Sequence, residues 1–423
     1  MASVVFYFQI HQPFRLRKYS VFDGSPLYFA DADNRRICER VAEKCYVPAT
    51  TLIRDLVKRH EGRFRVAYSI TGVAVEQLRA WAPEVIELLR ELADTGCCEF
   101  LGETYHHSLA FLYSREEFRE QVDEHEKMIR DVFGQTPRVF RNTELIFNND
   151  LAREIGAMTR AGGEPRYLGL CCEGVDWLLE GRRASDVYST PGGVLGRESP
   201  FGLLLKNHRL SDDIAFRFGR RDWSEWPLTA EKFAGWIDGI NGGGHVCNLF
   251  MDYETFGEHQ WADTGIFAFL EALPEAVLRT KPGHNDFLTP SEALERYAPA
   301  GEYDAPHYTS WADTERDLSA WLGNAMQSSA LHEIFKLEKE IKRQAAEWRV
   351  EGDARHARLA SDLLGDWRKL TTSDHFYYMC TKFFEDGDVH NYFNPYESPY
   401  DSYINYMNVL DNLRDRCRET VEA

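Results

Sequence analysis

The feature that most constrains the fold is an alternation of short apolar runs and helix-patterned stretches over the first 260 or so residues. Seven of the runs have the length of buried strands: residues 4–10, 64–71, 98–103, 138–145, 167–172, 203–208 and 245–252. Helical patterns occupy residues 39–60, 75–92, 116–132 and 229–240 between them. Nearly continuous apolar strands that alternate with helices predict a parallel sheet covered by helices. Seven such strands predict an α/β fold with an incomplete TIM-type (β/α)7 barrel.

The pattern changes near residue 304, after which helical periodicity dominates, as in residues 311–348, 353–370 and 400–421. We therefore predict a barrel catalytic domain at residues 1–303 and a C-terminal helical domain at residues 304–423 that completes the active-site cleft. The segment 371–400 between these helices is rich in aspartate, histidine and tyrosine. Four of its side chains have no obvious partner in a plain helix bundle and are expected to face the cleft: Asp374, His375, Asp388 and His390.

Charge and composition exclude several classes of partner. The net charge of −19 opposes broad contact with nucleic acid or with an anionic membrane, both of which need basic surfaces. No run approaches the roughly 20 apolar residues of a membrane span. Residues 1–13 lack the basic region and cleavage site of a signal peptide, and the nine cysteines include no C-x-x-C. We expect reduced thiols, a cytoplasmic location and no metal, and the oligomeric state stays open.

Five of the seven predicted strands end in polar, mostly titratable residues. These endings are the sequences HQP (11–13), GETYHHSL (102–109), RNTEL (141–145), KNHRLSDD (206–213) and DYETFGEHQW (252–261). In a TIM-type barrel the chemistry lies at the carboxyl ends of the strands. The convergence of these endings therefore predicts an active site at that face.

Two carboxylates stand out among these residues, Glu144 on the fourth strand and Asp252 on the seventh. Strands four and seven of a seven-stranded barrel face each other across its mouth. Two carboxylates across a cleft can cleave a glycosidic bond, one as nucleophile or base and the other as acid. The sequence alone leaves a retaining or an inverting mechanism open. It also leaves open that Glu144 only pairs with Arg141, and that Asp252 caps a helix or forms an ion pair.

The histidines and aromatic residues near these strand ends allow more than one interpretation. His11 could be a buried, hydrogen-bonded histidine or a substrate contact. The pair His106-His107 could suggest a metal site, but adjacent strand residues point to opposite faces, so at most one can enter the site. We place His106 there. The density of aromatic residues, Trp261 among them, favours a carbohydrate cleft.

The motifs together resemble glycoside hydrolase family 57, in its α-amylase-like branch. Five stretches resemble the conserved regions of that family in the same order: HQPFRLRKY, GETYHHSL, VFRNTELIF, FMDYETFGEHQW and FLTPSEALERY. Two more, LSDDIAFRF and SDHFYYMCTKFFEDGDVHNYFNPY, are similar to its short α-amylase-like members. The resemblance covers nearly the whole chain and implies a (β/α)7 barrel followed by a helical domain.

The resemblance also implies a retaining double displacement without metal or cofactor. Glu144 would be the nucleophile, Asp252 the general acid/base, and His11 a contact to sugar hydroxyls in the first subsite. Two departures concern the site, because many members carry a carboxylate where this chain has His106, and others a tryptophan where it has Arg141. The expected substrate-binding residues are His11, Gln12, His106, Arg141, Asp213, Glu254, His259, Trp261, Asp374 and His375.

The leading hypothesis is a retaining α-glucan hydrolase that cleaves α-1,4 bonds of maltooligosaccharides, starch or glycogen. A 4-α-glucanotransferase would use the same residues and pass the glycosyl group to a sugar instead of water. A metal-dependent polysaccharide deacetylase can share the barrel but needs an aspartate and two suitably spaced histidines, and no H-x-x-x-H occurs here. A glycan-binding protein with a vestigial site is a third interpretation, against which both intact carboxylates argue.

Overall fold

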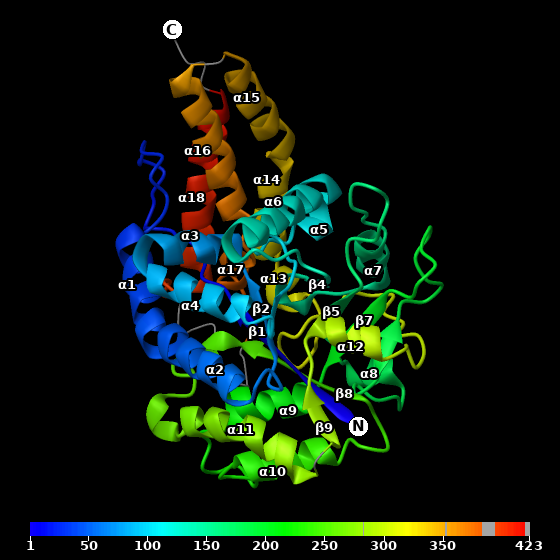
Figure 1. Ribbon diagram of the computed structural model, residues 1–423. Helices are drawn as coiled ribbons and strands as arrows, with labels where there is room; N and C mark the ends of the chain where they lie inside the picture. Colours follow the sequence, from blue (N-terminus) through cyan, green and yellow to red (C-terminus); the bar gives the residue numbers. More distant parts are fainter. Residues whose placement is uncertain (282, 352, 383–393, 419–423) are drawn as a thin grey trace.

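The computed structural model describes residues 1–281, 283–351, 353–382 and 394–418. All seven predicted strands are present as parallel strands (Figure 1): β1 (Ala2–Ile10), β2 (Val66–Ile70), β3 (Cys98–Phe100), β4 (Val139–Arg141), β5 (Gly169–Glu173), β7 (Gly202–Lys206) and β8 (Val246–Asp252). Every residue of β1 is buried, as expected for a strand covered on both faces. The prediction of an α/β fold with parallel strands is therefore confirmed.

The strands divide into two sheets, ordered β3-β2-β1-β8 and β4-β5-β7-β6. Two short strands were not predicted, β6 (Val187–Ser189), antiparallel to β7, and β9 (Asn285–Phe287), parallel to β1. Backbone hydrogen bonds link the sheets in two places, after β3 from Gly102 N–H to Val139 O of β4 (2.9 Å) and after β7 from Asn207 N–H to Asn248 O of β8 (2.9 Å). Glycine is required at the first link, because a Cβ on Gly102 would stand 2.8 Å from the Tyr167 ring.

Helices follow most strands and surround the sheets (Figure 1). The predicted helix at 75–92 is interrupted at Pro83, which begins a second helix because proline fits the first helical turn and not the interior. The longer elements are α1 (Asp31–Val41), α2 (Val47–Arg59), α3 (Gly72–Trp81), α4 (Pro83–Asp94), α6 (Arg115–Phe133), α7 (Asn149–Gly156), α10 (Ala230–Asp238), α11 (Ile266–Thr280) and α12 (Pro290–Arg296). Short turns are η1 (Ala42–Tyr46), α5 (Ala110–Tyr113), η2 (Thr143–Leu145), α8 (Asp176–Leu179), α9 (His208–Asp212), η3 (Asp213–Arg217), η4 (Tyr253–Thr255) and η5 (Ala262–Thr264).

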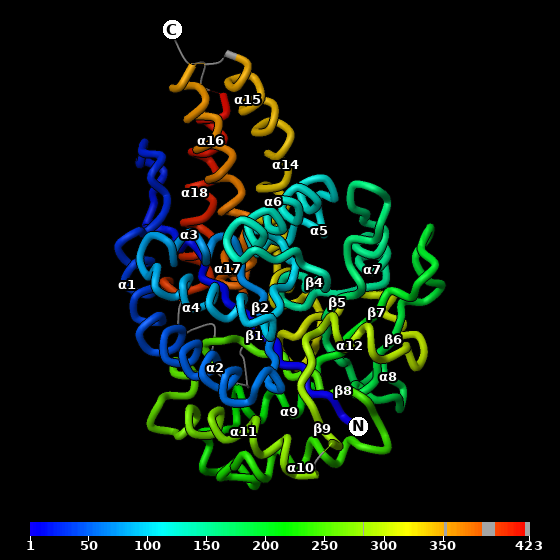
Figure 2. The backbone as a smooth tube through the Cα atoms, viewed as in Figure 1, coloured from blue at the N-terminus to red at the C-terminus, as the bar shows by residue number. Residues whose placement is uncertain are grey.

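The C-terminal part is helical, as predicted, and its long helices stand together at one end of the molecule (Figure 2, yellow to red). These elements are α13 (Ser319–Leu322), α14 (Ala325–Lys336), α15 (Glu338–Glu351), α16 (Ala354–Leu370), α17 (Ser373–Tyr377) and α18 (Pro399–Arg418). Their core is continuous with that of the second sheet, since Trp321 and Trp367 belong to the same buried cluster as Phe140 and Leu203. The helices therefore pack directly on the strand layer. Within the described ranges, no helix is both long enough and apolar enough to cross a membrane.

Candidate active site

A cavity of about 100 Å³ lies at the carboxyl ends of the strands. The end of β1, the turn after β3, the turn after β4, the end of β8 and the C-terminal helical region all contribute to its walls. Both predicted catalytic carboxylates line it. The lining residues are Gln9, His11, Gln12, Pro13, Arg15, His107, Glu144, Asp252, Glu254, His259, Trp311, Asp374 and Tyr378.

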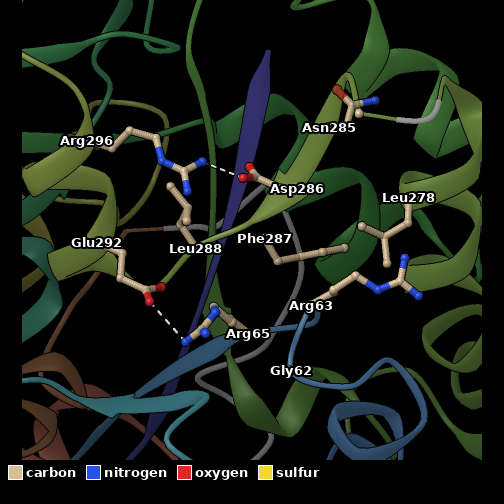
Figure 3. Close-up of a pocket in the computed structure, with 11 residues that line it drawn as sticks. Gly62, Arg63, Arg65, Leu278, Asn285, Asp286, Phe287, Leu288, Glu292 and Arg296 are labelled. Atoms are coloured by element: carbon tan, nitrogen blue, oxygen red, sulfur yellow. Dashed lines mark hydrogen bonds and ion pairs between the residues drawn. The ribbon is translucent and has the colours of Figure 1, made fainter.

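A larger cavity, of about 480 Å³, lies at the opposite, amino-terminal ends of β1 and β2 (Figure 3). Charged side chains that line this cavity form ion pairs with one another, Arg65 with Glu292 at 3.0 Å and Arg296 with Asp286. None of the predicted site residues lines it. The cavity around Glu144 and Asp252 is therefore the candidate active site.

Glu144 lies in the turn η2, directly after β4, with its side chain mostly buried (9% exposed). Its backbone is left-handed (φ 56°), as is that of Leu145 (φ 50°), a conformation that costs non-glycine residues about 1–3 kcal/mol. Trp311 Nε1–H donates to Oε2 at 2.7 Å, Ser373 Oγ–H donates to Oε1 at 3.4 Å, and His107 Nε2 lies 3.1 Å from Oε1. The carboxylate is thus held in one orientation by neighbours from three parts of the chain.

Asp252 is the last residue of β8 and pairs in register with Gln9 of β1. Two residues on, Glu254 is buried and accepts hydrogen bonds from the Tyr46 hydroxyl and from Gln12 Nε2 (3.2 Å). Burial, together with the nearby charge of Asp252, raises the pKa of Glu254 to about 8. Glu254 is therefore mostly protonated at neutral pH, which limits repulsion between the two carboxyl groups at this strand end.

Two stacked imidazoles, those of His11 and His107, form the next part of the wall, with ring centroids 4.0 Å apart. His11 Nδ1 lies 2.9 Å from Thr71 Oγ1, and His11 Nε2 lies 2.9 Å from Asp374 Oδ2. Burial raises the pKa of Asp374, but His11, His107 and Arg15 together outweigh it and hold that pKa well below its usual range. Asp374 is accordingly an ionised carboxylate on the cavity wall, brought there by α17.

Seven of the predicted site residues line the cavity: His11, Gln12, Glu144, Asp252, Glu254, His259 and Asp374. Arg141, the last residue of β4, does not line it and is fully buried 3.9 Å from Glu103. His106 is also buried outside the lining, with its ring packed on Tyr105, and burial lowers its pKa well below the ordinary value.

Three further predicted residues lie outside the lining. Asp213 pairs with Arg217 at 2.6 Å, and Trp261 is 54% exposed with the Lys44 ammonium above its ring. His375 is buried, hydrogen-bonded to the Lys369 carbonyl (3.2 Å) and packed on Tyr406. The role of these residues and of His106 and Arg141 in sugar binding stays a prediction. Asp388 and His390 lie outside the described residues.

Several lining residues were missed from the sequence, most importantly His107 and Trp311. The strand rule used for the histidine pair does not apply, because β3 ends at Phe100 and His107 lies in a later turn with φ 51°. Trp311 comes from a distant segment with no local motif. The other missed residues are Gln9, Pro13, Arg15 and Tyr378.

The family model for Glycosyl hydrolase family 57 matches residues 5–306, most of the chain and all of its parallel strands. The chain belongs to glycoside hydrolase family 57. This family 57 enzyme is α-amylase-like: it is 39% identical over 416 residues to a protein of Methanocaldococcus jannaschii described as "Putative alpha-amylase". The match covers 96% of this chain and 83% of that protein.

Several solved structures are similar in fold, one of them described as a GH57-type enzyme. A branching enzyme from Pyrococcus horikoshii aligns with a TM-score of 0.65 and 15% identity over 99% of this chain and 94% of its own. The α-amylase AmyC from Thermotoga maritima aligns with a TM-score of 0.60 and 12% identity, over 99% of this chain and 95% of its own. The 4-α-glucanotransferase from Thermococcus litoralis aligns with a TM-score of 0.58 and 17% identity. That match spans 89% of this chain but only 56% of the glucanotransferase. At these identities the likeness is one of fold.

Proposed function

We propose that this family 57 enzyme is a retaining α-glucan hydrolase that cleaves α-1,4 bonds of maltooligosaccharides, starch or glycogen. The observation that carries the proposal is that Glu144, just after β4, and Asp252, the last residue of β8, line one cavity at the carboxyl ends of the strands. Two carboxyl groups facing one cleft are the groups that double displacement at a glycosidic bond requires. The similarity to a protein described as an α-amylase supports the choice of substrate.

In this proposal Glu144 is the nucleophile and Asp252 the general acid/base. Hydrogen bonds to both oxygens of Glu144 fix the orientation of its carboxylate, which favours attack from one direction. Asp252 would protonate the leaving oxygen in the first step and accept a proton from water in the second. The protonated Glu254 beside it limits the negative charge at this wall.

The proposal extends to the architecture. The two sheets, linked by hydrogen bonds from β3 to β4 and from β7 to β8, would form one (β/α)7 barrel at residues 1–303. Residues 304–423 would complete the cleft, since Trp311, Asp374 and Tyr378 belong to this part and line the cavity. The substrate would then bind between strand ends and helical segments, with polar contacts to His11 and Asp374 and an aromatic surface at Trp311.

Substitution of the two carboxylates tests the mechanism. Glu144→Gln should lower kcat on a maltooligosaccharide by about 10³-fold or more with an unchanged melting temperature, because an amide cannot attack the anomeric carbon.

Asp252→Ala should slow natural substrates far more than activated aryl glycosides, which need little protonation of the leaving group. Glu295→Gln, an exposed position, is the control. A near wild-type Glu144→Gln enzyme, or an equal loss on both substrates for Asp252→Ala, would contradict these roles.

The alternative is a 4-α-glucanotransferase, which would use the same two carboxylates with a sugar as acceptor. The favouring observation is that the nucleophile is mostly buried, which limits access of water to the intermediate. Pure maltotriose separates the two activities when its products are resolved over time. A hydrolase gives only shorter sugars at low substrate concentration, whereas a transferase also gives longer ones from the start.

A further inference from the structure

The side chain of His107 lies between two carboxylates in the interior of the site. Its Nε2 is 3.1 Å from Glu144 Oε1, and its Nδ1 is 3.4 Å from Glu103 Oε2. The His107 side chain is 3% exposed and the Glu103 side chain is fully buried. A neutral imidazole has a single N–H, so one of its nitrogens would present a lone pair to a carboxylate oxygen. Only the doubly protonated ring donates to both neighbours.

From this geometry we propose that His107 is an imidazolium that holds the Glu144 carboxylate ionised and oriented for attack. Its role as a positioning residue rests on the proposed function, whereas its charge state rests on the geometry alone. His107 would not react itself. It would supply a fixed positive charge, bonded to Glu103 on one side and to the nucleophile on the other.

The backbone conformation at His107 and Glu144 indicates that the surrounding structure holds both residues in place. Both His107 (φ 51°) and Glu144 (φ 56°) have left-handed backbones, which side-chain-bearing residues adopt only where the surroundings enforce them. The turn is held by His107 N–H to Thr104 O (3.2 Å) and by Ser373 N–H to His107 O (2.9 Å). The second bond ties the turn to α17, so helical segment and strand end together place the imidazole.

The titratable groups around His107 carry charges of both signs. The surroundings of the stacked partner, His11, fit a neutral ring. Thr71 Oγ1 accepts from Ala74 N–H and its hydroxyl can donate to His11 Nδ1, so that His11 Nε2–H donates to Asp374. Burial and the neighbouring His107 both lower the pKa of His11. The other titratable groups that face His107 or its partner Glu103 are Tyr7, Glu144, Arg141, His125 and Asp374.

The electrostatics agree with the geometry. Burial lowers the pKa of His107, but hydrogen bonds to Glu103 and Glu144 outweigh it and raise the pKa to about 9. The pKa of Glu103 is lowered, since His107, His125 and Arg141 together outweigh its burial. Glu103 thus provides a permanent negative charge behind His107, which keeps the ring protonated when Glu144 loses its charge on forming a glycosyl ester.

The charge state can be measured without any substrate. Ring ¹⁵N chemical shifts of histidine-labelled protein should show one of the 14 histidines still doubly protonated at about pH 8, above the ordinary pKa of about 6.5. That signal should disappear in His107→Gln and should titrate about one unit lower or more in Glu103→Gln. His60→Gln, another buried histidine with one carboxylate 3.7 Å away, is the matched control and should leave it unchanged.

The positioning role is read from the pH profile. His107→Gln should lower kcat/KM on a maltooligosaccharide about 100-fold near neutral pH and move its acidic limb to higher pH, because Glu144 loses its charged donor. His60→Gln should keep the wild-type profile. If His107→Gln does not fold, Glu103→Gln should show a smaller change in the same direction.

The outcomes separate the two proposals. A signal that titrates at the ordinary pKa, or one that persists in His107→Gln, would overturn the charge state. A wild-type pH profile for folded His107→Gln would overturn the positioning role. The expected ¹⁵N titration in a protein that acts on no α-glucan would establish the imidazolium and contradict the proposed function instead.

Discussion

At the scale of single residues, Asp374 and His375 are neighbours in α17 but meet different surroundings. Asp374 lines the cavity and contacts His11, whereas His375 is buried between the Lys369 carbonyl and the Tyr406 ring. The sequence predicts both as substrate-binding, because both are polar residues without an obvious helix-bundle partner. Successive residues of a helical turn point about 100° apart, so one can face a cavity and the next a core.

These neighbours should therefore differ in effect. Asp374→Asn should lower activity on maltooligosaccharides at least about tenfold with little change in melting temperature, because it removes a charge from the cavity wall. His375→Asn should destabilise the fold by about 1–3 kcal/mol and leave kinetics unchanged where the protein is folded. Thermal unfolding and steady-state kinetics on both variants check this. A purely kinetic defect in His375→Asn would instead support its role as a substrate contact.

His375 also gives the sign of one pH effect. Burial lowers the pKa of His375 to about 4, whereas an unfolded chain has a value near the ordinary 6.5. Between these values the unfolded state binds a proton that the folded state does not, so the contribution of this residue to stability is lost as pH falls from about 6.5 to about 4. The pKa of His107 is shifted the other way, so its contribution is complete below about pH 6.5 and is lost as pH rises through about 9.

At the scale of elements, the loop from Thr309 to Arg316 links the nucleophile to the ends of two strands. Thr309 pairs with Phe147 after β4, and Trp311 N–H donates to the Glu144 carbonyl (3.2 Å). Arg316 lies 3.7 Å from Glu173 at the end of β5 and 3.5 Å from Asp212. This loop therefore places the Trp311 indole against the catalytic carboxylate, although it is more than 160 residues away in the chain.

Trp311→Phe tests the contribution of that indole N–H. The variant keeps an aromatic ring but loses the 2.7 Å hydrogen bond to Glu144 Oε2. A hydrogen bond to a charged group contributes about 1.5–3 kcal/mol, so kcat should fall about 10- to 100-fold with a nearly unchanged melting temperature. Trp321→Phe is the control, because Trp321 is fully buried in the helical core and does not line the cavity. It should lower the melting temperature only, and an unchanged kcat in Trp311→Phe would show that the bond is not used.

At the scale of the whole molecule, ionic contacts join α6 of the strand region to the C-terminal helices. Glu117 of α6 is fully buried and lies 2.8 Å from both Arg368 of α16 and Lys342 of α15. Arg368 also contacts Glu120 and Glu124. Because of these contacts and the shared apolar core, we expect the helical part and the strands to unfold as one unit.

Arg368→Met should lower the free energy of unfolding by about 3 kcal/mol, because it leaves the buried Glu117 with less compensating charge. The transition should stay single and KM should stay unchanged, since Arg368 does not line the cavity. Arg343→Met removes an exposed pair with Glu347 and should cost less than about 1 kcal/mol. Denaturant unfolding monitored by two probes measures both. Two separate transitions in the wild type would show that residues 1–303 and 304–423 are independently stable units.

The sequence by itself determined the seven parallel strands and the two carboxylates that follow from their ends. Seven apolar runs became seven parallel strands, because burial on both faces requires nearly continuous apolar residues. Glu144 and Asp252 were identified because they lie at the ends of such apolar runs, and parallel strands bring their carboxyl ends to one face. These are local patterns, and they are readable without knowing how the chain folds.

Only the tertiary structure decided how the cavity is completed. His107 enters it in place of His106 because its backbone adopts a left-handed turn, which no strand or helix periodicity encodes. Trp311 and Tyr378 reach it from segments far along the chain, and their placement depends on helices packing onto the second sheet. Side-chain direction after an element ends is set by long-range contacts, and those contacts exist only once the chain has folded.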